Sequence, residues 1–157
     1  MVTQRARALA GLVFAAAVAG FAVFGVFAWR SVSVLEMDAS GALHNFEAVR
    51  ARLSGLPLVE REASGGLVRR PSVKAAGPVP TELHALAYYG DGQRLVRADV
   101  PLWFFKVKGP ALRYAVRGTG LDLDSLNLTA TDLENAGARL ILDETRSNGD
   151  RLLVWTE

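Results

Sequence analysis

Residues 139–156, RLILDETRSNGDRLLVWT, decide the fold of the C-terminal part of the chain. Two apolar runs are separated there by a polar segment, Ser-Asn-Gly-Asp, at residues 147–150. An Asn-Gly pair between two apolar runs is the strongest short signal for a β-hairpin, because both residues tolerate the positive φ of a tight turn. The sequence therefore predicts a terminal hairpin, whose last strand is held in place by Val154 and Trp155.

Further strand signals precede this hairpin. Apolar runs at residues 83–89 and 93–100 flank a Gly-Asp-Gly turn and predict a second hairpin. Residues 58–62 and 67–70 predict a shorter, frayed pair, and residues 112–116 a further strand. Residues 31–37 alternate weakly and fit either a strand or the end of a preceding helix.

Two segments carry helical signals. Leu43, Phe46, Val49 and Leu53 recur at helical spacing and predict an amphipathic helix of about twelve residues, which opens at a capping segment and closes before a proline. Residues 119–138 are predicted as helical in part, because Thr129 begins a capping box. The predicted fold class is α+β, with an antiparallel sheet of about four to six strands and two or three short helices.

An uninterrupted apolar run, ALAGLVFAAAVAGFAVFGVFAW, occupies residues 8–29. As a helix it would be about 33 Å long, enough to cross a hydrocarbon core of about 30 Å. A cleaved signal peptide is the alternative, but its apolar region usually spans only about 7–15 residues and ends at a small-residue cleavage site. The sequence therefore predicts an uncleaved signal-anchor and a single-pass membrane protein.

Basic residues flank this run unequally. Arg5 and Arg7 precede it, whereas Arg30 alone follows it before the first acidic residues. The positive-inside rule then places the N-terminus in the cytoplasm. The predicted organisation, in the inner membrane of a bacterium, is a cytoplasmic tail at 1–7, a transmembrane helix at 8–29 and a periplasmic domain at 30–157.

Small residues line one side of the predicted transmembrane helix. They would let a neighbouring helix approach closely, and small-xxx-small spacing is typical of membrane helices that pair. The alternative is an alanine-rich span without a helical partner. The predicted helix-packing residues are Gly11, Ala15, Ala19 and Ala22.

The charges of the chain argue against nucleic-acid binding. Beyond residue 30 the sequence holds fifteen basic and sixteen acidic residues, so the pI near 9.3 comes from the N-terminal flanks. Residues 50–117 carry a net charge of +7, and residues 118–157 carry −5. The favoured interpretation is that these two charged regions neutralise each other across a folded domain; the alternative is that they steer a partner.

No motif for catalysis or metal binding stands out. His44 and His84 lack a second ligand at metal-site spacing, so both are interpreted as structural or surface residues. The absence of cysteine excludes iron–sulfur ligation and covalent haem attachment. The sequence predicts no catalytic residue, no metal, no cofactor and no enzymatic activity. The remaining hydrolase candidates are two carboxylate pairs that would have to converge with distant groups, namely Asp122 with Asp124 and Asp143 with Glu144.

Two segments of the predicted outer domain are candidates for docking a partner. Three prolines within residues 71–80 exclude a helix and favour an extended strap, either a surface loop or an arm on a neighbouring subunit. The apolar run at 102–105 is interpreted as an inner face of the sheet or as an exposed docking patch. The predicted partner-docking residues are Pro71, Pro78, Pro80, Trp103, Phe104 and Phe105.

These observations lead to a functional hypothesis. The chain is expected to be a non-catalytic accessory subunit of a larger membrane complex, such as a respiratory or photosynthetic one. Its partners would be membrane protein subunits and the lipid bilayer, and not nucleic acid. The alternatives are an anchored periplasmic sensor or ligand-binding module and, third, an anchored hydrolase.

Overall fold

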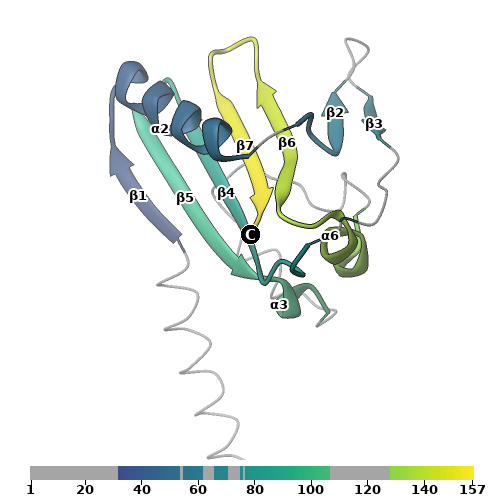
Figure 1. Ribbon diagram of the computed structural model, residues 1–157. Helices are drawn as coiled ribbons and strands as arrows, with labels where there is room; N and C mark the ends of the chain where they lie inside the picture. Colours follow the sequence, from purple (N-terminus) through teal and green to yellow (C-terminus); the bar gives the residue numbers. More distant parts are fainter. Residues whose placement is uncertain (1–31, 54, 62–65, 71–74, 76, 107–127) are drawn as a thin grey trace, which may run out of the picture. The chain divides into compact units, whose positions relative to one another are not determined.

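Seven strands form one mixed sheet in the computed structural model, which describes residues 32–53, 55–61, 66–70, 75, 77–106 and 128–157. The strand order is β1-β5-β4-β7-β6-β2-β3 (Figure 1). The strands are β1 (Val32–Glu36), β2 (Val59–Arg61), β3 (Leu67–Arg69), β4 (Glu82–Tyr89), β5 (Arg94–Pro101), β6 (Arg139–Thr145) and β7 (Arg151–Thr156). The helices are α2 (Ala39–Arg52), α3 (Leu102–Lys106) and α6 (Ala130–Ala136).

Both predicted hairpins are confirmed. β4 and β5 pair along their whole length, from Glu82 opposite Pro101 to Tyr89 opposite Arg94. β6 and β7 pair around the Asn-Gly turn, with a register shift between Leu140 and Leu142. β2 and β3 confirm the shorter predicted pair, and β1 shows that residues 32–36 form a strand.

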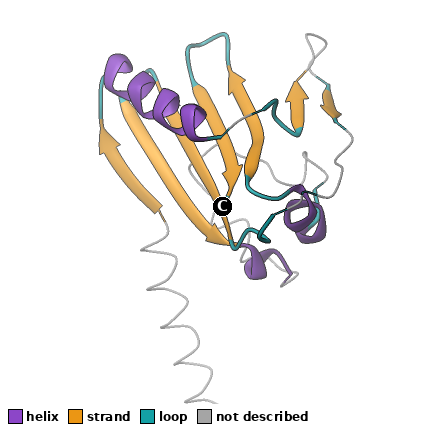
Figure 2. Cartoon of the chain, viewed as in Figure 1, coloured by secondary structure: helices purple, strands orange, loops and turns teal. Residues whose placement is uncertain are grey.

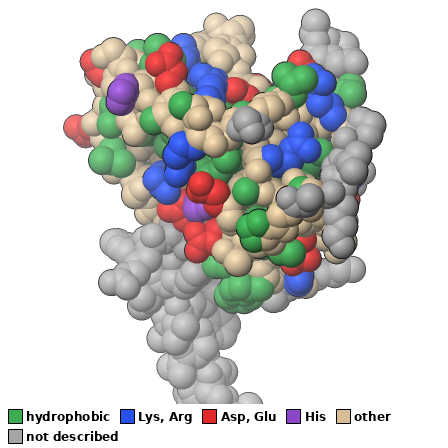
Figure 3. All heavy atoms as spheres, viewed as in Figure 1, with side chains coloured by type: hydrophobic (Ala, Val, Ile, Leu, Met, Phe, Trp, Pro, Cys, Tyr) green, Lys and Arg blue, Asp and Glu red, His purple; other side chains and the backbone are tan. Residues whose placement is uncertain are grey.

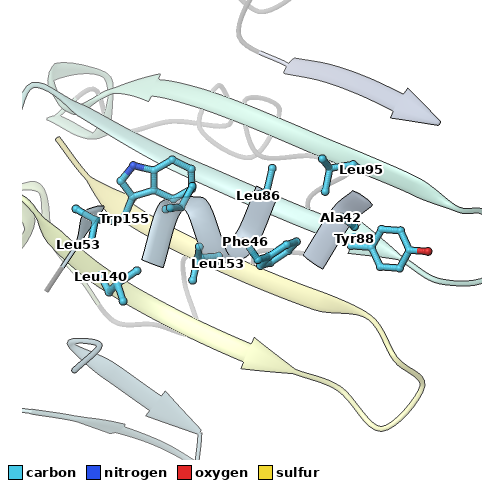
Figure 4. Close-up of a cluster of buried hydrophobic side chains, with 10 residues drawn as sticks. Ala42, Phe46, Leu53, Leu86, Tyr88, Leu95, Leu140, Leu153 and Trp155 are labelled. Carbon is cyan, nitrogen blue, oxygen red and sulfur yellow. The ribbon is translucent and has the colours of Figure 1, made fainter. Parts of the chain in front are cut away.

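α2 lies across one face of the sheet and closes the main core there (Figures 1 and 4). It begins at Asp38, whose side chain accepts a hydrogen bond from the backbone N–H of Gly41. Its apolar stripe packs on side chains from four strands. The buried cluster comprises Ala42, Phe46, Val49, Leu53, Leu86, Tyr88, Leu95, Leu140, Leu153 and Trp155.

The predicted fold class needs correction. The described chain is a mostly-sheet domain with few helices (Figure 2), and its sheet is mixed and has seven strands instead of an antiparallel four to six. The one parallel pairing joins β2 to β6 at Val59 and Leu142. It arises because the chain leaves α2 and docks beside β6, where the N–H of Leu58 donates to the carbonyl of Leu140. Local sequence patterns carry no signal for such a distant pairing.

The predicted single-pass topology is also corrected. Among the described residues, no helix is long and apolar enough to cross a membrane. The structure therefore does not support the predicted single-pass signal-anchor, nor the inner-membrane localisation with a periplasmic domain. Residues 8–29 and the helix-packing set Gly11, Ala15, Ala19 and Ala22 lie outside the described residues.

Candidate functional site

α3 exposes one large aromatic side chain and buries its neighbours. Trp103 is 59% exposed, whereas Leu102 and Phe104 are 2% and 4% exposed. The rings of Trp103 and Phe104 meet edge-on, with centroids 5.6 Å apart. Because large aromatic side chains dominate the energetics of protein interfaces, the exposed Trp103 is a candidate contact residue.

Two backbone hydrogen bonds fix the proline strap beside helices, one within it at Ala75 and one directly after it at Thr81. The N–H of Leu102 donates to the carbonyl of Thr81 at 2.8 Å, so the strap runs next to the start of α3. The N–H of Ala75 donates to the carbonyl of Asn135 in α6 at 3.0 Å. Gly137 follows α6 with φ +71°, and a Cβ there would lie 2.6 Å from the Cβ of Ala75. A glycine is therefore needed at position 137 for the strap to approach α6 this closely.

α6 supports α3 from the side. The Nζ of Lys106 lies 2.7 Å from Oε1 of Glu134, and the two helices are in contact. α6 begins with the predicted capping box, in which Thr129 and Asp132 bond reciprocally. The guanidinium of Arg69 and the hydrogen bonds from Thr129 lower the pKa of Asp132 to about 2. The helix that supports α3 is thus capped and tied to β3 by a charged pair.

The predicted docking residues separate into exposed and buried members. Pro78 is exposed, while Pro80 and Phe104 are buried and Phe105 is half-buried. Pro71 lies outside the described residues. Val79, which the sequence did not single out, is 62% exposed and stands between the two prolines. We use the name α3 surface for Trp103 on α3 together with the exposed Pro78 and Val79, which belong to the strap that joins the start of α3 through the Thr81–Leu102 hydrogen bond.

A second candidate site, which is polar, surrounds His84 on the α2 side of the sheet. His84 in β4 faces Asp99 in β5 and Trp155 in β7 at its register positions. Its Nδ1 lies 2.5 Å from Oδ1 of Asp99, and its ring stacks on Trp155 with centroids 5.1 Å apart. Its Nε2 lies 3.7 Å from Glu82 and 3.9 Å from Glu157. The sequence interpretation of His84 as a structural or surface residue did not foresee this cluster.

The charges around His84 are largely paired with one another. Burial raises the pKa of Asp99, but the hydrogen bond from His84 and the nearby Arg97 outweigh it and hold that pKa below its ordinary value. Glu157 accepts a hydrogen bond from Trp155 Nε1 at 3.3 Å and pairs with Arg52 at 3.4 Å. These contacts join three strands and the end of α2, which favours a structural role for His84.

Ion pairs confirm that the two oppositely charged regions of the sequence neutralise each other. Among the described residues, five pairs join a basic residue from 50–117 to an acidic residue from 118–157. They are Arg50–Asp143, Arg52–Glu157, Arg61–Glu144, Arg69–Asp132 and Lys106–Glu134. On the face of the molecule that Figure 3 shows, acidic and basic side chains lie side by side. Of the four carboxylates proposed from the sequence for a hydrolase, Asp143 and Glu144 each form an ion pair with an arginine. Asp122 and Asp124 lie outside the described residues.

A shallow hollow lies between the β1–α2 turn and the β4–β5 hairpin. Its volume is about 310 Å³, and its lining residues are Glu36, Met37, Asp38, Gly92 and Gln93. This polar lining differs from the apolar pocket with a few polar groups that a small-molecule site typically has. Within the described part of the chain, no group of three or more His, Asp or Glu side chains is placed to hold a metal ion.

Comparisons with known proteins return no relative. No protein-family model matches the chain, and neither a curated protein nor a solved structure matches it.

Proposed function

We propose that this chain is a non-catalytic subunit of a larger protein assembly, and that it docks to a partner protein through the α3 surface. The observation that carries the proposal is the exposure of Trp103 on a helix whose neighbouring side chains are buried. The sequence led to the hypothesis of an accessory subunit of a membrane complex, in which residues 103–105 and the strap were the predicted docking elements; the present proposal keeps the docking elements and not the membrane anchor.

The exposed area of Trp103 gives a measure of what docking would gain. A tryptophan side chain buries up to about 250 Å², so the 59% that remains exposed is worth at most about 4 kcal/mol, at about 25 cal/mol per Å², if a partner covers it fully. Val79 adds a second apolar side chain that is 62% exposed. Interfaces draw most of their affinity from a few such residues, with tryptophan prominent among them.

The rigidity of the α3 surface supports the same proposal. α3 is fixed by its two buried residues, by the backbone bond to Thr81 and by the Lys106–Glu134 pair. A contact residue on a fixed support loses little conformational freedom when it binds, which lowers the entropic cost of association. Because many charged side chains of the domain are already paired with one another, an apolar contact is the favoured mode of docking.

Co-purification from the source cells tests the proposal. The tagged full chain would be isolated under gentle conditions, together with a Trp103→Ser variant and a Val68→Ser variant. Val68 is a matched control because it is 45% exposed and lies on β3, at the far edge of the sheet from β1 and β5. Mass spectrometry would then quantify the proteins that accompany each form.

We expect a stoichiometric partner with the wild-type chain and with Val68→Ser, and loss of that partner with Trp103→Ser. Circular dichroism must show that Trp103→Ser remains folded. A wild-type chain that purifies alone, or a partner retained equally by all three forms, would contradict the proposal.

A further inference from the structure

β1 forms an outer edge of the sheet with apolar side chains on both of its faces. Among the described residues it pairs with β5 alone, in a regular register over five positions. Val34 is 59% exposed and Leu35 is 48% exposed, and they point to opposite faces because they are neighbours in a strand. The outward N–H and C=O groups of such an edge are a template for pairing with another strand.

The other edge of the sheet differs from β1. β3 has only three residues, its Arg69 pairs with Asp132, and the adjoining Arg70 pairs with Glu60. Short length and charge are two ways in which proteins protect a sheet edge from pairing. β1 contains no proline, no lysine and no register shift, and its one charged residue, Glu36, stands at its end. The two edges of this sheet are therefore not equally protected.

We infer that β1 pairs antiparallel with β1 of a second copy of this chain, about a two-fold axis at Val34. The sequence of β1, VSVLE, restricts the register. Along an edge strand, only every second residue points its N–H and C=O groups outward. Two such edges can therefore form backbone hydrogen bonds only in every second register. Val34 opposite the partner's Val34 is an allowed register and the one that pairs all five residues.

The side chains fit this register. On one face Val34 would contact the partner's Val34, and on the other face Leu35 would lie opposite the partner's Ser33. Glu36 would lie opposite the partner's Val32, so no like charges face each other across the pair. The contact is small compared with stable dimer interfaces, so the dimer should be weak and depend on concentration.

Disulfide trapping tests the register directly, because the chain contains no cysteine. The full chain with Val34→Cys would be oxidised over a range of concentrations, alongside Ser33→Cys and Val68→Cys. Opposed residues in an antiparallel pair bring their Cα atoms to about 4.5–5.5 Å, within the range of a disulfide, whereas diagonal positions are farther apart.

We expect Val34→Cys to form the covalent dimer at least tenfold faster than Val68→Cys and faster than Ser33→Cys. Adding Leu35→Lys to Val34→Cys should remove most of this advantage, because a lysine on an edge strand disfavours pairing with another strand. Equal rates at positions 34 and 68 would overturn the pairing. A faster rate at position 33 would overturn the register, as would a rate at position 34 that Leu35→Lys leaves unchanged.

Discussion

Replacement of Phe46 by alanine tests whether α2 closes the main core. Phe46 is fully buried among side chains from the sheet, such as Leu86 and Leu153. Removing a buried phenylalanine ring costs about 3–5 kcal/mol. The guanidinium of Arg50 lies 5.9 Å from the ring centroid, and loss of this cation–π contact adds roughly 0.5 kcal/mol. We therefore expect Phe46→Ala to lower the free energy of unfolding by about 4 kcal/mol.

Urea and thermal denaturation of the full chain, followed by circular dichroism, measure this loss. For a domain of this size each kcal/mol corresponds to about 4 °C, so the melting temperature should fall by roughly 15 °C. Glu47→Ala is the matched control, because Glu47 is exposed on the same helix and its replacement should change stability by less than about 0.5 kcal/mol. A loss below about 1 kcal/mol for Phe46→Ala would refute the packing of α2 on the sheet.

Two further predictions concern α6 and the strap. Because the pKa of Asp132 is lowered to about 2 from its ordinary 3.8, its ionised form stabilises the fold above pH 4, and this contribution is lost as the pH falls toward 2. The stability difference between wild type and Asp132→Asn, measured by urea denaturation, should therefore shrink over that interval; a constant difference would contradict the assignment. Gly137→Ala should cost about 1–3 kcal/mol or more, because its backbone conformation is essentially restricted to glycine and the new Cβ would meet Ala75. Gly77→Ala, where a Cβ meets nothing, should be nearly neutral in the same thermal denaturation assay.

Local sequence patterns predicted most of the strands of the sheet, but little of the order in which these strands lie side by side. The hairpins β4–β5 and β6–β7 follow from apolar runs around Gly- and Asn-containing turns, because their hydrogen bonds join residues close in sequence. α2 follows from the spacing of Phe46 and Val49. The places of β1 beside β5 and β2 beside β6 depend on distant contacts, which leave no periodic signal in either segment.

The candidate sites were predicted only in part. The sequence named residues 103–105 as one apolar patch, but the orientation of α3 decides that Trp103 is exposed and Phe104 buried. That orientation depends on the bond from Leu102 to Thr81, which no motif marks. A hairpin around the three-residue Gly-Asp-Gly turn would place His84 opposite Ala98. The pairing of His84 with Asp99 arises because the loop has four residues, from Gly90 to Gln93. Trp155 lies beside them only because β7 pairs with β4, and local sequence patterns do not predict that pairing.

The affinity of the purified chain for the partner found by co-purification tests the proposed function most directly. A tryptophan that anchors an interface contributes about 2 kcal/mol or more, which corresponds to roughly a thirtyfold change in Kd. We predict that Trp103→Ser weakens binding by at least this factor, while Val68→Ser, also exposed, binds as the wild type does. A Kd for Trp103→Ser within twofold of the wild-type value would contradict docking through the α3 surface.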